Sequence, residues 1–104
     1  MAESHRSQAG TFALSDDGGH WVFHGELTID AAAKVLESSN AMPLPPSGVI
    51  DFRGLLQADS TALALMLAVK RRAVAEGRTV TFTALPDAVK SLAVVYGIDK
   101  LVLS

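Results

Sequence analysis

Apolar and polar residues alternate in some segments of the chain and recur every three or four residues in others. Residues 11–15 and 20–24 alternate as β-strands do, and the sequence Asp-Asp-Gly-Gly at 16–19 is a strong turn signal between them. The two segments therefore predict a β-hairpin. Alternation in the second strand places Trp21 and Phe23 on one face, with His20, Val22 and His24 on the other.

A helix is predicted at residues 29–37, after residues 25–28 leave the strand, and either Thr28 or Asp30 would cap it. Its apolar residues at helical spacing would cover one face of the sheet; they are Ile29, Ala32, Ala33 and Leu36. Residues 42–48 contain three prolines and are predicted to form a connecting loop.

Two strands and two helices are predicted in the second half of the chain. A buried strand at 49–52 leads through a loop at 53–58 to a helix at 60–76, which Gly77 ends. A strand at 79–83 follows, and then a helix at 87–96, whose core face would comprise Val89, Leu92, Ala93 and Tyr96.

The predicted order is β-β-α-β-α-β-α, which is typical of an α/β fold. Strands that are joined through a helix pair in parallel, so the sheet is expected to be mixed, with the N-terminal strand as its antiparallel member.

The polar step Asp59-Ser60-Thr61 opens directly onto the longest apolar run of the sequence. The Asp59 carboxylate can accept hydrogen bonds from the first free amides of a helix, and Ser60 would then lie in the first turn, at the positive end of the helix dipole. A hydroxyl at this place can be phosphorylated or bound by a partner without disrupting the fold. The same residues can also serve as a cap alone.

The helix at 60–76 has two different faces. At about 100° per residue, one face comprises Ala62, Met66, Val69 and Ala73, flanked by Leu63 and Leu65, and would cover the sheet. The opposite face comprises Ser60, Ala64, Leu67, Ala68, Arg71 and Ala75. A helix on a sheet usually has a charged outer face, so this small-residue face predicts docking on another protein. The alternatives are a third helix that covers it, or alanines that serve only helix propensity.

Composition narrows the class of protein. A chain of 104 residues with 49% apolar residues is long enough for one domain, and a net charge of −2 gives no reason to expect nucleic-acid binding. The absence of cysteine excludes disulfides and thiol chemistry. Residues 1–10 are expected to be a flexible polar tail without a signal peptide, and no segment reaches the roughly 20 apolar residues of a membrane span. We therefore expect a cytoplasmic protein.

No metal, cofactor or catalytic site is predicted. His20 and His24 are four residues apart on a predicted strand, which separates them by about 13 Å, too far to share a metal ion. Ser60 has no histidine near it in the sequence, and the chain lacks a glycine-rich phosphate loop and a nucleophile elbow. We expect that the protein is not an enzyme.

Several segments resemble the STAS domain, the fold of the anti-sigma-factor antagonists. They are residues 49–52, 58–63, 77–82 and 92–101, and a weaker resemblance extends from Phe12 onward. The resemblance implies a single STAS domain over residues 11–104, with a mixed sheet of four or five strands backed by helices. One departure is Ala62, where the family tends to have glycine, which permits a closer approach to the helix than alanine does.

The resemblance implies two functions. In the antagonists, a partner kinase phosphorylates the serine after the aspartate, which corresponds to Ser60. The sequence is more similar to STAS subunits of ABC phospholipid transporters that maintain outer-membrane lipid asymmetry. In these subunits the corresponding hydroxyl contacts the cytosolic ATPase, within a complex that includes a membrane permease. We expect such a subunit, peripheral to the inner membrane through its partner, and its predicted partner-binding residues are Asp59, Ser60, Thr61, Ala64, Leu67, Ala68 and Arg71.

Overall fold

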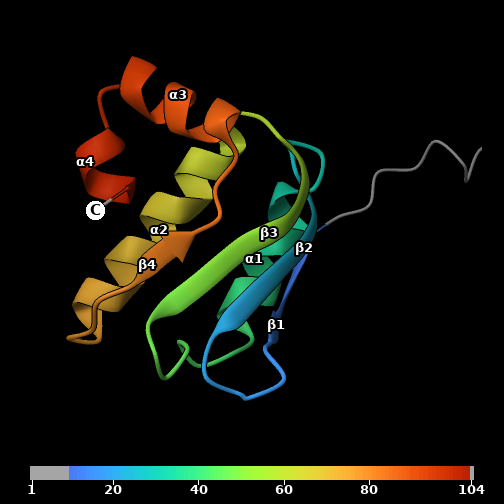
Figure 1. The fold of residues 1–104 in the computed structure, drawn as a ribbon, viewed down its shortest axis with the longest axis vertical. Coiled ribbons are helices and arrows are strands. Elements are labelled where there is room, and N and C mark those ends of the chain that lie inside the picture. The colour runs from blue at the N-terminus through green and yellow to red at the C-terminus, as the bar shows by residue number, and fades with distance from the viewer. Residues whose placement is uncertain (1–9, 104) are drawn as a thin grey trace, which may run out of the picture.

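A mixed sheet of four strands is the centre of the computed structural model, which describes residues 10–103 (Figure 1). The strands are β1 (Thr11–Leu14), β2 (Trp21–Leu27), β3 (Val49–Ala58) and β4 (Thr81–Thr83), and they lie in this order across the sheet. β1 and β2 are antiparallel, whereas β2 with β3 and β3 with β4 are parallel. The predicted mixed sheet with an antiparallel N-terminal strand is confirmed.

Helices cover one face of this sheet (Figure 1). They are α1 (Ala32–Asn40), α2 (Thr61–Ala75), α3 (Asp87–Val95) and α4 (Asp99–Val102). α1 and α2 lie side by side behind the strands, and α3 and α4 both contact α2. The order up to α3 is the predicted β-β-α-β-α-β-α, and the one-turn helix α4 was not predicted.

An aromatic cluster joins all four strands on the helix-covered face. Phe12 of β1, Trp21 and Phe23 of β2, Phe52 of β3 and Phe82 of β4 form a chain of rings whose neighbouring centroids lie 5.0–6.1 Å apart. Such tilted and edge-to-face pairs add to the free energy gained from burying the rings. Both β2 aromatics are fully buried, as the alternation predicts, and so is the predicted inner face of α2, which comprises Ala62, Met66, Val69 and Ala73.

The predicted ends of β2 and β3 are wrong, because both strands are longer. β2 continues through residues 25–27, which were expected to leave the strand, and β3 continues through 53–58, which were expected to form a loop. These parts pair with each other in parallel, and the last pair joins Leu27 to Ala58. Two register shifts interrupt the alternation that would reveal them in the sequence. Gly54 permits close approach, since a Cβ there would lie 2.5 Å from a backbone carbonyl oxygen of β2.

The predicted start of the first helix is also wrong. Because β2 runs to its end at Leu27, the chain must turn before a helix can begin, and the Ala31 amide donates to the Thr28 carbonyl oxygen in this turn (2.9 Å). α1 therefore begins at Ala32, with Ala31 at the N-cap position and no side-chain cap. Neither Thr28 nor Asp30 caps it.

This later start changes which side of α1 faces the core. Val35 and Ser39 are buried, together with Ala31 at the N-cap position. Of the predicted core face, Ala33 is exposed, Ile29 is 73% exposed and Leu36 is 42% exposed. Two large apolar side chains that the pattern assigned to the core thus lie on the surface.

The C-terminal elements follow the prediction with smaller differences. α2 ends before Gly77, which adopts a φ of +68°, as expected of a helix stop. β4 comprises three of the five residues predicted. The placement of Tyr96 in the core is wrong: α3 ends at Val95, Tyr96 is 58% exposed, and Val102 of α4 is fully buried.

Residues 42–48 form the predicted loop, and two arginines hold it against the domain. The guanidinium of Arg72 donates to the carbonyl oxygens of Ser39 (2.8 Å) and Met42 (2.7 Å). These carbonyls lie at the end of α1 or just after it, where the helix has no further amides to bond to them. Arg78 donates to carbonyl oxygens further along the same loop. These contacts tie the C-terminal end of α2 to the segment between α1 and β3.

Candidate functional site

The junction between β3 and α2 is built around the Asp59 carboxylate. Its Oδ1 accepts a hydrogen bond from the Thr61 amide (2.8 Å) and its Oδ2 accepts one from the Ile29 amide (3.0 Å). The hydrogen bond from the Thr61 side chain, together with those from these two amides, holds the pKa of Asp59 below its usual value, although desolvation acts in the opposite direction. One side chain thus joins the first amide of α2 to the turn between β2 and α1.

Asp59 satisfies a free amide at the start of the helix, as predicted, but the helix begins one residue later than expected. Ser60 occupies the N-cap position rather than the first turn, and α2 starts at Thr61. The Ser60 hydroxyl makes no cap hydrogen bond, and the residue is exposed. The hydroxyl is therefore available to an enzyme or a partner, because the cap bond to the backbone comes from the neighbouring carboxylate.

The predicted outer face of α2 does face outward. Ser60, Ala64 and Arg71 are exposed, and Leu67 and Ala68 are half-buried. α1 contacts α2 on one side and α4 contacts it on the other, so the neighbouring helices border this face. Thr61, also half-buried, lies at its N-terminal end.

An apolar hollow of about 150 Å³ lies between α1 and α2 beside this face. Its lining is Leu27, Ala32, Leu36, Thr61, Ala64, Leu65 and Ala68. Ile29 lies nearby, since its amide is bonded to Asp59, and its side chain is exposed to solvent. Sequence reasoning missed Ile29 and Leu36 as candidate site residues because their helical spacing assigned them to the core.

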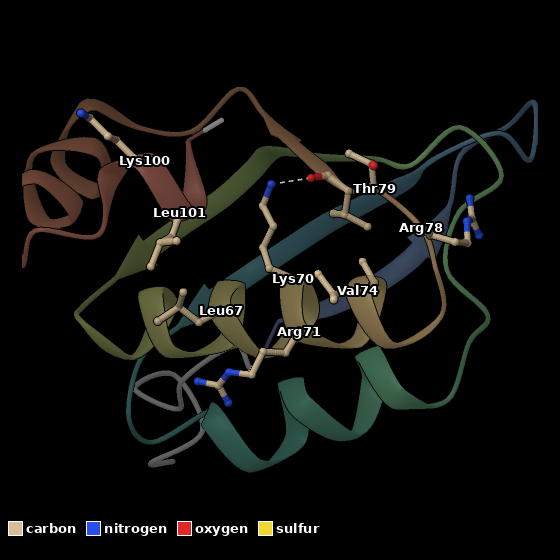
Figure 2. Close-up of a pocket in the computed structure, with 10 residues that line it drawn as sticks. Leu67, Lys70, Arg71, Val74, Arg78, Thr79, Lys100 and Leu101 are labelled. Atoms are coloured by element: carbon tan, nitrogen blue, oxygen red, sulfur yellow. Dashed lines mark hydrogen bonds between the residues drawn. The ribbon is translucent and has the colours of Figure 1, made fainter.

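A larger groove of about 590 Å³ lies along the other side of α2, between its C-terminal half, residues 78–80 and α4 (Figure 2). Leu67 and Arg71 line this groove. Two of the predicted partner-binding residues therefore belong both to the outer face of α2 and to this groove.

Comparison with family models agrees with this fold. The model of the family described as "Mlab, STAS domain" matches residues 11–103. The chain belongs to this STAS-domain family. The predicted resemblance, and with it the MlaB type of STAS domain, is confirmed over nearly the whole range expected. STAS domains are generally non-enzymatic. No curated protein matches the chain.

Within this STAS domain, Ala62 lies on the inner side of α2. Its side chain is fully buried against the sheet, one residue from the half-buried Thr61 and two from the exposed Ser60. The methyl group that replaces the family's glycine therefore packs in the core and does not project from the outer face. This departure from the family pattern therefore affects packing under the helix and leaves the outer face open to a partner.

The predicted strand at 20–24 included both His20 and His24, but β2 begins at Trp21. His24 is within β2 and exposed, whereas His20 precedes the strand, where its Nδ1 lies 3.7 Å from Asp17. Within residues 10–103, no three His, Asp or Glu side chains gather as a metal site would require. No helix in the same range is long and apolar enough to cross a membrane.

Proposed function

We propose that this STAS domain is a non-catalytic subunit that binds the cytosolic ATPase of an Mla-type phospholipid ABC transporter and supports its assembly or activity. The contact surface is the N-terminal part of the outer face of α2, around Ser60 and Ala64. Membership in the MlaB-type family is the observation that carries the proposal.

The surroundings of Ser60 support this surface. The serine and Ala64 are exposed, and Ile29 (73% exposed) and Leu36 (42% exposed) add apolar area beside them. Isolated exposed apolar residues are common, but several around one small-residue helix face are typical of an interaction site. The Asp59 carboxylate fixes the relative position of the two segments that contribute them, because it bonds to both backbones.

The test is binding of the purified protein to the purified Mla-type ATPase subunit of the same organism. Ala64→Glu places a charge at the centre of the proposed surface, and we expect at least a tenfold loss of affinity because that charge would be desolvated on docking. Ala88→Glu is the matched control, since Ala88 is also an exposed helical alanine, but on α3. Equal binding by both variants, with unchanged thermal stability, would exclude this surface.

A second candidate function is that of an anti-sigma-factor antagonist switched by phosphorylation of Ser60. The exposed, uncapped hydroxyl of Ser60 favours it. A phosphate adds about −1.5 to −2 charge next to the Asp59 carboxylate and would weaken an apolar contact there. Mass spectrometry of the protein from its native host, with Ser60→Ala as control, distinguishes the functions: phosphate at Ser60 supports the switch, and ATPase binding without phosphate supports the transporter subunit.

A further inference from the structure

The groove between α2 and α4 combines an apolar centre with a cationic border. Leu67, Val74, Val80 and Leu101 form its apolar walls, together with Ala73 beneath them. Figure 2 shows Leu67 of α2 and Leu101 of α4 facing each other across it. Its volume of about 590 Å³ falls within the range of roughly 300–1,000 Å³ that is usual for small-molecule sites.

Among the described residues that line the groove, every ionisable side chain is a cation. Four of the nine Lys and Arg residues of the sequence are found here, namely Lys70, Arg71, Arg78 and Lys100, and no Asp or Glu is among the described residues that line it. In a chain with a net charge of −2, this is a local concentration of positive charge. Such a lining favours an anionic ligand.

The cations are divided between the interior and the border, and the Arg78 guanidinium also donates to carbonyl oxygens of the loop at 44–46. Lys70 projects from α2 into the groove, where its ammonium donates to the Val80 carbonyl oxygen and lies 5.3 Å from the centre of the Phe82 ring (Figure 2). Burial lowers the pKa of Lys70. Arg71 and Lys100 are exposed and point outward from opposite sides of the groove.

We propose that this groove binds a single-chain fatty acid, with the alkyl chain between α2 and α4 and the carboxylate at the cationic border. The Arg71 guanidinium suits a carboxylate because its fork can donate two parallel hydrogen bonds. Among the described residues that line the groove, Thr79 has the only uncharged polar side chain, so the lining side chains offer few acceptors for the N–H groups of an extended peptide backbone. An alkyl chain needs none, which favours a fatty acid over a protein segment.

Calorimetric titration of the full chain with dodecanoate, below its micelle concentration, tests the proposal. We expect saturable binding of one dodecanoate per chain, and shortening the chain to decanoate should weaken binding by up to about fourfold per methylene removed. Dodecyltrimethylammonium and dodecanol should bind at least tenfold more weakly, because they lack the negative charge. Equal binding of the three dodecyl compounds, or binding that does not saturate, would overturn the proposal.

Two matched variants locate the site. Val74→Glu places a carboxylate inside the groove, and Val95→Glu places the same charge on α3 outside it; the valines are 78% and 77% exposed, so neither change should affect folding. We expect Val74→Glu to weaken dodecanoate binding at least tenfold and Val95→Glu to leave it unchanged. Equal effects of the two variants would refute this location. The titration uses the isolated protein, so its outcome is independent of ATPase binding.

Discussion

Asp59 provides a sharp test of how the site is held together. Replacing it with alanine removes the acceptors for two backbone amides, that of Thr61 at 2.8 Å and that of Ile29 at 3.0 Å. Loss of a helix-capping side chain typically costs about 1 kcal/mol, within a range of roughly 0.5–2 kcal/mol. The second hydrogen bond, from the Ile29 amide, joins the junction between β3 and α2 to the turn after β2, and its loss adds roughly 0.5–1.5 kcal/mol to this cost. We therefore expect Asp59→Ala to lower the free energy of unfolding by about 1–3 kcal/mol at pH 7.

The effect should depend on pH in a defined direction. The pKa of Asp59 is lowered in the folded protein, so its ionised carboxylate stabilises the fold above the unfolded-state pKa of about 3.9. This contribution is lost as the pH falls through the lower pKa of the folded state. The difference between the wild type and Asp59→Ala should therefore be constant from pH 7 to pH 5 and shrink below about pH 4.

Urea denaturation at pH 7, 5 and 3 measures this difference, and thermal melting should show a loss of roughly 4–8 °C per kcal/mol. Asp30→Ala is the control: Asp30 is an exposed carboxylate next to Ile29, and its removal should change stability by less than about 0.5 kcal/mol. The reasoning would be refuted if Asp59→Ala were as stable as the wild type at pH 7, or if Asp30→Ala were equally destabilised.

Five further substitutions, two of them controls, test the packing around the site by urea denaturation. Arg72→Met should cost about 1–3 kcal/mol, because it frees two carbonyl oxygens at the end of α1, whereas Arg71→Met, at an exposed position, should cost less than about 0.5 kcal/mol. Gly48→Ala should cost about 1–3 kcal/mol more than Gly77→Ala: both glycines have positive φ, but only at Gly48 would a Cβ meet a backbone oxygen, at 2.4 Å. Ala62→Gly should destabilise α2 by about 1 kcal/mol and leave partner binding unchanged, since this methyl group is buried.

Elements with one buried face could be predicted from the sequence because their pattern is local. Trp21 and Phe23 alternate with His20, Val22 and His24, and both aromatic side chains are fully buried in β2. Likewise Ala62, Met66 and Val69 recur every three or four residues and face the sheet from α2. In both cases a single period identifies the buried side, since each element contributes only that side to the core.

The second halves of β2 and β3 could not be predicted, because their structure depends on pairing between distant segments. The register shifts break the alternation, and Gly54 resembles a loop residue until the neighbouring strand is known. The wrong start of α1 follows from this error. A strand that ended before Gly25 would let a helix begin at Ile29, whereas a strand that runs to Leu27 requires a turn first.

The same distinction applies to the candidate site. The bond from Asp59 to Thr61 joins residues two apart, so cap chemistry alone predicts it, whereas the bond to Ile29 joins residues thirty apart and depends on the extended strands. The second bond changes the surface that a partner would meet. By holding the turn after β2 against the start of α2, it places an exposed isoleucine beside Ser60 and widens the apolar area from one helix face to two segments. A partner that docks at Ser60 would therefore contact the turn between β2 and α1 as well as α2.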